Sequence, residues 1–200
     1  LGDDAPSLYC SNHQTGQLTR GLVGLPFPYF YGFKSDGIFQ NMDEVKAYTN
    51  AEGNMIMPNA EPGDVRFVDI DGDGVIGDGD KTYIGKGIPD WVFGLNLGFD
   101  WKGLDFSILL QGQLGAQAYN VSRRIDLGAV NLPKYMLNRW TGEGTTNKYP
   151  KFEVGDATNY VVSDVWVEDA SFLRARNVQL GYPLPQNITK KFFVQRLRVY

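Results

Sequence analysis

The sequence has almost no cysteine or histidine. Its 200 residues hold one of each, Cys10 and His13. One cysteine excludes an internal disulfide, and one histidine leaves little material for a zinc site or a Ser-His-Asp triad. The only adjacent acids that we considered as a catalytic pair, Glu168 and Asp169, would point to opposite faces of a strand. These absences predict that the protein is not an enzyme.

Long apolar runs and an excess of positive charge are also absent. No stretch reaches 18 consecutive apolar residues, which excludes a transmembrane helix. Transmembrane β-strands are not excluded, because their residues only alternate between apolar and polar. The net charge of −4 predicts no nucleic-acid partner, since such a partner requires a basic surface to neutralise its phosphates.

Glycine and aromatic residues, in contrast, are plentiful. The sequence has 24 glycines and 14% aromatics, a composition that favours turns and strands. The clearest alternation covers residues 91–111, where the apolar positions change from odd to even numbers. A two-residue turn at Lys102-Gly103 explains the change, because the residues that flank such a turn point the same way. The apolar face of this hairpin contains Trp91, Phe93, Leu95, Leu97, Phe99, Trp101, Leu104, Phe106, Ile108 and Leu110.

Two architectures could use this wide apolar surface. A soluble sandwich would bury it against a second sheet, whereas an outer-membrane barrel would turn it toward lipid. Eleven residues at roughly 3.3 Å each, tilted by about 45°, cover roughly 25 Å, which is the height of the apolar band of a barrel. Trp91 and Trp101 mark both ends of the first strand, as interfacial aromatic residues do, so the pattern favours the barrel.

Other segments give weaker signals. Asn41 and Glu44 have the spacing of a helix N-cap and its N3 partner, which predicts a short helix to about Tyr48. The remaining predicted elements are an aromatic strand from Phe27 to Phe33, a short helix near Pro133 to Asn138, strand residues from Tyr160 to Val167, and a strand from Phe172. In the long connection, Tyr135, Trp140 and Tyr149 could contact sugar or pack the loop.

The stretch DIDGDGVIGDGD, residues 69–80, matches the D-x-D-x-D-G pattern of a calcium loop. Gly74 provides the sharp turn at position six, and a flexible cage of oxygen atoms suits calcium better than magnesium. The alternative is a solvated loop in which aspartates form Asx-turns. The predicted ligands of a structural Ca²⁺ are the carboxylates of Asp69, Asp71, Asp73 and Asp80 and the carbonyl of Val75.

Five stretches of the sequence together resemble one protein family. They are FYGFKSDGIFQN (30–41), PGDVRFVDIDGDGVIGDGDKTYIG (62–85), FGLNLGFDWKGLDFSILLQGQLGAQAYN (93–120), NRW (138–140) and VEDASFLRARNVQLGYPLP (167–185). In this order they resemble the C-terminal part of the SusC/RagA family of TonB-linked outer-membrane transporters. The resemblance implies an all-β fold in which residues 1–200 are an incomplete part of a large antiparallel transmembrane β-barrel, with long extracellular loops and short helices in the loops.

The resemblance also implies a location and partners for the chain. Residues 62–85 and 112–170 would be extracellular loops, and 91–111 would be a transmembrane hairpin with its turn in the periplasm. The protein would import glycans or peptides with a SusD-type surface lipoprotein, in contact with outer-membrane lipid, and TonB would act through N-terminal parts that this sequence lacks. The alternative function is a secreted, calcium-stabilised β-rich module that binds carbohydrate on aromatic faces.

Overall fold

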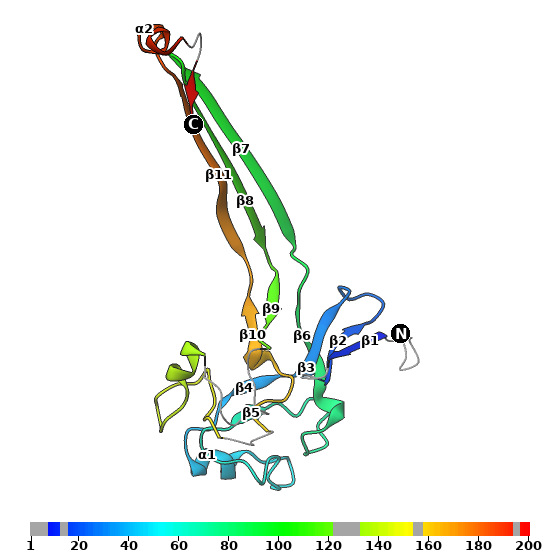
Figure 1. Cartoon of the computed structure of the whole chain (residues 1–200). Coiled ribbons are helices and arrows are strands. Elements are labelled where there is room, and N and C mark those ends of the chain that lie inside the picture. Colours follow the sequence, from blue (N-terminus) through cyan, green and yellow to red (C-terminus); the bar gives the residue numbers. More distant parts are fainter. Residues whose placement is uncertain (1–7, 13–15, 122–132, 154–157, 194–196) are drawn as a thin grey trace. The chain divides into compact units, whose positions relative to one another are not determined.

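A computed structural model describes residues 8–12, 16–121, 133–153, 158–193 and 197–200 (Figure 1). The chain divides into two compact units, which we call the loop unit and the strand unit. The loop unit contains residues 1–88 and 117–169, and the strand unit contains residues 89–116 and 170–200. The helices of the described ranges are all too short or too polar to cross a membrane. His13 lies outside the described residues.

The strand unit is one antiparallel sheet with the strand order β12-β11-β8-β7. Its strands are β7 (Trp91–Trp101), β8 (Leu104–Leu114), β11 (Phe172–Pro183) and β12 (Arg198–Val199), and a short helical segment formed by α2 (Gln186–Thr189) and η4 (Lys190–Phe192) joins the last two. β7 and β8 pair without interruption from Trp91 and Leu114 to Trp101 and Leu104. The predicted hairpin is therefore confirmed, although β8 continues past Gln111.

The turn between β7 and β8 contains only Lys102 and Gly103, as the sequence predicts. Their φ angles are 49° and 87°, so both residues adopt left-handed conformations. Two positive φ angles are typical of the tight turn whose twist matches that of a β-hairpin. Glycine adopts this conformation without steric cost, which explains why Gly103 follows Lys102. The turn fixes the pairing register of both long strands.

The register of the sheet collects apolar side chains on one face. The rings of Phe99 and Phe106 pair across β7 and β8 with their centroids 5.4 Å apart. On the other side of β8, Leu180 of β11 pairs with Phe106. β11 contains a bulge at Arg176, between the paired residues Ala175 and Asn177, which shifts its alternation by one residue. The bulge keeps Leu173 and Ala175 on the same face as Val178 and Leu180, whereas Phe172 lies on the opposite face beside Arg174.

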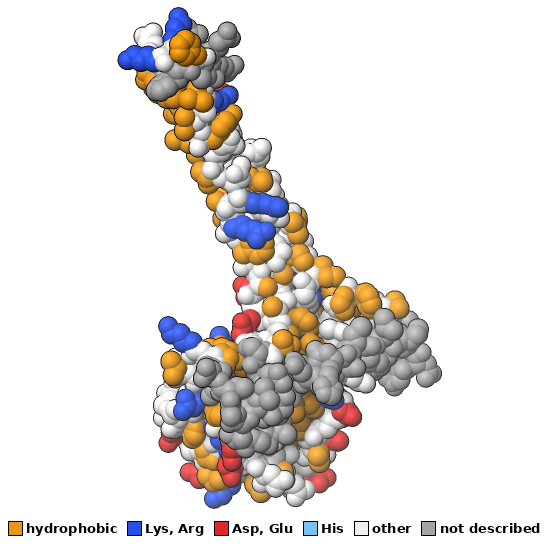
Figure 2. All heavy atoms as spheres, in the orientation of Figure 1, with side chains coloured by type: hydrophobic (Ala, Val, Ile, Leu, Met, Phe, Trp, Pro, Cys, Tyr) orange, Lys and Arg blue, Asp and Glu red, His pale blue; other side chains and the backbone are white. Residues whose placement is uncertain are grey.

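This apolar face is exposed. Leu97 retains 49% of its accessible surface, and the terminal residues Trp91 and Trp101 retain 72% and 62%. Among the described residues of the strand unit, Ala116 is the only buried hydrophobic residue. Hydrophobic side chains accordingly follow the strands over the surface (Figure 2). A sandwich would need a second sheet over this face, and the described residues of the unit form no such layer.

The loop unit is built from short strands and turns. One sheet has the order β1-β2-β3-β6, and two further pairs join β4 to β5 and β9 to β10. The strands are β1 (Leu8–Asn12), β2 (Gly16–Gly21), β3 (Tyr29–Phe33), β4 (Ser35–Ile38), β5 (Val65–Phe67), β6 (Lys81–Lys86), β9 (Gln117–Tyr119) and β10 (Val167–Asp169). The helices are α1 (Met42–Ala47) and the 3-10 turns η1 (Asp78–Asp80), η2 (Lys134–Asn138) and η3 (Asp164–Trp166).

The predicted start of α1 is confirmed. The Asn41 side chain accepts a hydrogen bond from the Glu44 backbone N–H at 2.9 Å, and the Glu44 carboxylate accepts one from the Gln40 backbone N–H at 2.8 Å. Each side chain thus satisfies a backbone donor at the helix start. The helix near Pro133 to Asn138 is present as the 3-10 turn η2.

Two predicted strands differ from the structure. The aromatic strand begins at Tyr29, and Phe27 lies exposed before it. The strand predicted from Tyr160 to Val167 is wrong for most of its length, because only Val167 belongs to a strand. Tyr160 and Trp166 are both buried and their rings stack at 5.4 Å, so the chain between them folds back instead of extending. Core packing therefore overrides the local strand preference.

A partly buried polar cluster joins two distant segments of the loop unit. The Lys151 Nζ lies 2.7 Å from a carboxylate oxygen of Glu61 and 3.3 Å from one of Asp64. The Asn159 amide donates to Asp64 and accepts from the Val65 backbone N–H. Burial opposes the charge on Lys151, but Glu61 and Asp64 outweigh it and raise the lysine pKa above its ordinary value. The cluster pairs a carboxylate that would otherwise be buried alone.

Gly112 of β8 is predicted to tolerate no side chain. A Cβ atom there would lie 2.4 Å from the Phe93 ring and 2.9 Å from the Phe172 carbonyl oxygen, so a strand backbone would have to move. We expect Gly112→Ala to lower the stability of the full-length protein by about 1–3 kcal/mol. The temperature at which the folded band disappears in gel electrophoresis measures this effect.

The matched control is Gly94→Ala in the neighbouring strand. The nearest atom to a Cβ at Gly94 is the Leu110 carbonyl oxygen at 3.9 Å, which is an ordinary contact. This variant should unfold at the temperature of the wild type. Equal effects of the two substitutions would show that Phe93 does not cover Gly112 as described.

Candidate metal centre

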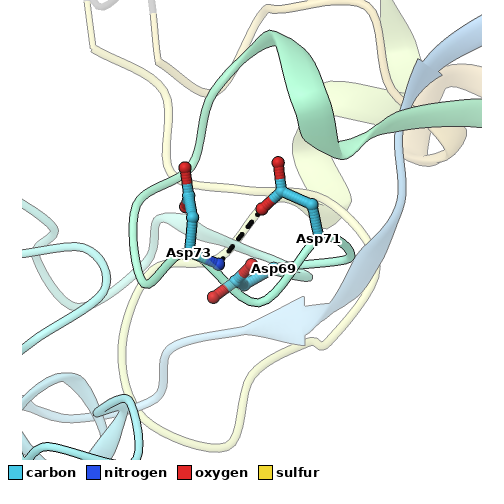
Figure 3. Close-up of side chains that lie close together, drawn as sticks. All are labelled: Asp69, Asp71 and Asp73. Carbon is cyan, nitrogen blue, oxygen red and sulfur yellow. Dashed lines mark hydrogen bonds between the residues drawn. The ribbon is translucent and has the colours of Figure 1, made fainter.

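The acidic segment 69–80 connects β5 to β6 in the loop unit. Its first three aspartates, Asp69, Asp71 and Asp73, lie close together (Figure 3). One carboxylate oxygen from each lies within 4.8 Å of the others. The structure therefore brings together the residues predicted at positions one, three and five of a calcium loop.

Hydrogen bonds to the backbone hold these carboxylates in place. Asp69 accepts from the backbone N–H groups of Gly72 at 2.7 Å and Gly74 at 2.9 Å. Asp71 accepts from the Asp73 N–H at 3.1 Å, which is the bond drawn in Figure 3, and Asp73 accepts from the Val75 N–H at 2.8 Å. Gly72 and Gly74 have φ angles of 75° and 83°, so glycine is needed at both turns.

The charge of the three aspartates is not balanced by a neighbouring side chain. Among the described residues, none of the three has a lysine or arginine within 4.0 Å. The nearby Lys81 pairs instead with Asp78, at 2.6 Å. Three converging carboxylates repel one another, and a divalent cation among them would remove that repulsion.

Asp80 has a different environment from the other four predicted ligands. It is completely buried, and its two oxygen atoms accept from the backbone N–H groups of Ile70 and Gly77, both at 2.7 Å. Burial raises the pKa of the Asp80 carboxyl, but the hydrogen bonds from Gly77, Ile70 and Asp71 outweigh burial and leave the pKa below its ordinary value. Asp80 is not one of the three acids that converge, and its role in the described structure is to close the loop.

The donor set of the loop fits calcium. Carboxylate oxygens of Asp69, Asp71 and Asp73 would hold the ion, because hard cations prefer oxygen ligands. The Val75 side chain is exposed, as expected for a residue that would contribute only its carbonyl. Ligation of Ca²⁺ by Asp69, Asp71, Asp73, Val75 and Asp80 remains a prediction.

The aromatic residues of the long connection pack against the protein. Tyr135 and Tyr149 lie with their ring centroids 5.4 Å apart and contact the cluster around Trp166. The Trp140 indole N–H donates to Gln40 at 3.2 Å. Of the two roles considered for these side chains, loop packing is the one that the structure shows.

Comparison with known proteins shows what kind of protein carries this loop. The chain is 30% identical over 170 residues to TonB-dependent receptor P26 of Formosa agariphila, an alignment that covers 84% of the chain and 17% of that receptor. It is 31% identical over 134 residues to TonB-dependent receptor SusC of Bacteroides thetaiotaomicron, covering 66% of the chain and 13% of SusC. The chain belongs to the SusC-type TonB-dependent receptors. It spans less than a fifth of the length of either relative.

A solved structure supports the same fold. The chain is similar to a solved structure described as "Structure of the RagAB peptide importer in the 'open-open' state". The match covers 99% of this chain and 20% of the solved chain, with a TM-score of 0.62 and 22% sequence identity. No family model matches the chain. The receptor segment is therefore an all-β part of an outer-membrane β-barrel, and it is not an enzyme. The resemblance in the sequence is confirmed.

Asp80 is predicted to stabilise the loop whether or not an ion binds. Asp80→Ala in the full-length receptor removes the acceptors of buried N–H groups, which costs about 1–3 kcal/mol. Amide hydrogen exchange at Ile70 and Gly77 should accelerate by on the order of tenfold or more. Because the Asp80 pKa is lowered on folding, its contribution is present above the ordinary aspartate pKa of about 3.9 and is lost as the pH falls below it.

Asp78→Ala is the control for this experiment. The Asp78 side chain is exposed, and within the described ranges it pairs only with Lys81 at the surface, where an ion pair contributes little. Exchange in this variant should match the wild type. If Asp80→Ala exchanges no faster than Asp78→Ala, the hydrogen bonds of Asp80 do not hold the loop.

Proposed function

We propose that the chain is part of a TonB-dependent importer that carries glycans or oligopeptides across the outer membrane. The observation that supports this function is the exposed apolar face of the strand unit, whose long strands have no covering layer among the described residues. β7 has 11 residues, enough to cross the roughly 25 Å apolar band when tilted by about 45°. Lipid is the environment in which such a face is stable.

The proposed placement follows from this assignment. Residues 91–111 cross the membrane as a hairpin, and Trp91 and Trp101 lie at its two interfaces. The Lys102-Gly103 turn faces the periplasm, because periplasmic turns of such barrels are short. The segment 62–85 precedes β7 in the chain, and the segment 112–170 follows it, although β8 extends to Leu114. Both would then be extracellular loops, because they continue from the strand ends that are not joined by the Lys102-Gly103 turn.

The proposed partners are a SusD-type surface lipoprotein and TonB. Relatives of the chain are named TonB-dependent receptors, and one of them is SusC. TonB coupling would depend on parts of the receptor outside residues 1–200. The lipoprotein would meet the receptor at its extracellular loops, where cargo is captured before import.

The lipid-facing role is tested by placing an arginine on each face of β7. Leu97 lies on the exposed apolar face near the middle of the strand, and Asn96 lies one residue away on the opposite face. We expect Leu97→Arg in the full-length receptor to lose about 2–4 kcal/mol, because arginine is costly at the centre of a bilayer. The heat-modifiable receptor should therefore become scarce in outer membranes, whereas Asn96→Arg should accumulate normally.

Import itself is measured in cells in which the full-length receptor is the only receptor for the tested cargo. Fluorescent oligosaccharide and oligopeptide pools should enter the periplasm only when TonB is functional, and Leu97→Arg should reduce uptake in proportion to the receptor lost from the membrane. Normal membrane levels of Leu97→Arg would contradict the lipid-facing strand. Uptake that persists without TonB would contradict the importer.

We also propose that the aspartate loop holds a structural Ca²⁺. The convergence of Asp69, Asp71 and Asp73 without a balancing cation among the described residues supports this role. The ion would clamp an extracellular loop, since the three carboxylates that would hold it are fixed by backbone N–H groups of the same loop.

Asp73→Ala distinguishes a calcium site from a turn. Among the described residues, the Asp73 side chain accepts only from the Val75 N–H, so its removal should disturb the apo loop little. In the wild-type receptor, calcium should slow amide exchange of residues 69–80 by on the order of tenfold, and Asp73→Ala should abolish this calcium-dependent slowing. Asp78→Ala should keep it. A wild-type loop whose exchange does not respond to calcium is only a solvated turn.

A further inference from the structure

Two arginines share one acceptor on the polar face of the strand unit. The Gln111 side-chain oxygen accepts a hydrogen bond from Nη2 of Arg174 and another from Nη1 of Arg176, each at 3.3 Å. Gln111 and Arg174 are directly paired between β8 and β11. A neutral amide thus holds two guanidinium groups close together on the face opposite the apolar residues.

Arg176 stands at the bulge of β11. In regular alternation Arg174 and Arg176 would follow each other along one face at the spacing of a strand. The register shifts between Ala175 and Asn177, which leaves Arg176 as the extra residue. Arg176 therefore has no directly paired residue on β8, and its guanidinium donates to the Gln111 oxygen. The Arg174 guanidinium is also ordered by the Phe172 ring, with its carbon 4.8 Å from the ring centroid.

No side chain of β7 covers the Gln111 amide beside the arginines. Gly94 of β7 pairs with Gln111 on the side away from β11, and it has no side chain to cover the amide. The nearest atom to a Cβ built at Gly94 is 3.9 Å away. Both arginines are exposed, so a solute that reaches this face can contact their free N–H groups.

The charge of the pair is not compensated. Among the described residues, neither Arg174 nor Arg176 has a carboxylate within 4.0 Å. In contrast, Arg198 on the same sheet pairs with Asp105, and Arg66 of the loop unit pairs with Asp36. Two like charges at a neutral oxygen repel each other, and the repulsion is stronger near low-dielectric walls than in bulk water.

We infer that Arg174 and Arg176 form a binding site for an oxyanion of the cargo, a carboxylate or a sulfate. Guanidinium groups match both anions with paired N–H donors, and an anion between the two arginines would remove their repulsion. Gln111 and Phe172 position the arginines. This inference rests on the proposed function, because in a barrel the face opposite lipid borders the path of the cargo. The site would favour acidic cargo over neutral cargo of the same shape.

The experiment compares a charged probe with a neutral probe on the purified full-length receptor. Tetragalacturonate carries carboxylates, and its methyl ester does not. We expect calorimetry to show tetragalacturonate binding at least about tenfold more tightly than the ester, with inorganic sulfate as a competitor. In Arg174→Gln/Arg176→Gln, the preference for the charged probe should disappear.

The control is Lys102→Gln/Lys190→Gln, which removes the same charge from the turn and from η4 of the same unit. It should keep the preference, because these lysines do not contact Gln111. Equal binding of the two probes to the wild type, or an unchanged preference in the arginine variant, would overturn the site. If the arginine variant keeps the preference but unfolds at a lower temperature, the two arginines instead form an ion pair with a carboxylate of the receptor itself.

Heat modifiability of each preparation separates this test from that of the proposed function. A receptor that inserts as a heat-modifiable barrel but does not discriminate between the probes refutes only the oxyanion site. A wild-type receptor that does not insert refutes the importer. The comparison of probes on the wild type needs no variant, so it stands even if the arginine variant folds poorly.

Discussion

The fixed register between β7, β8 and β11 is the constraint on which the strand unit depends. Side chains of a strand alternate between two faces, so a shift of one residue would exchange the apolar and polar faces. The Lys102-Gly103 turn sets the register on one side of β8, and the bulge at Arg176 corrects it on the other. The turn and the bulge are both local features, yet together they determine which side chains lie on the apolar face and which lie on the polar face.

The two faces of this sheet have opposite chemical requirements. In the proposed membrane-spanning arrangement, the apolar face would need only contact with hydrocarbon, so its residues could vary in shape as long as they are apolar. The polar face carries charged groups, and each must find a partner or remain near water. Asp105 illustrates the first case, since it accepts from Arg198 and lies against Gly181, where a side chain would collide with it. The arginine pair at Gln111 illustrates the second.

Sequence reasoning succeeded where periodicity is regular and contacts are local. The hairpin and its turn follow from one alternating stretch of the sequence, and the cap of α1 follows from two residues three positions apart. The convergence of Asp69, Asp71 and Asp73 is also local, because it depends on glycines within the same loop. The environment of Asp80 could not be predicted, because the sequence does not reveal that backbone N–H groups donate to both of its carboxylate oxygens.

The loop unit could not be predicted in the same way. Its order depends on contacts between residues far apart in sequence, such as Lys151 with Asp64 and Asn159 with Val65. Lys151 and Asn159 belong to none of the stretches that resemble the family, and nothing in the sequence links them to Asp64 and Val65. The fold of Tyr160 to Trp166 shows the same limit, because the burial of two aromatic rings replaced the expected strand.

The outer edge of β7 has a consequence for how the receptor assembles. Within the described residues β7 pairs only with β8, so one side of an 11-residue strand presents unpaired backbone donors and acceptors. Hydrocarbon cannot satisfy these groups, and each would cost several kcal/mol there. The hairpin therefore cannot rest in a bilayer by itself. It must enter together with a neighbouring strand that completes the ladder, which makes insertion a collective event of the whole barrel wall.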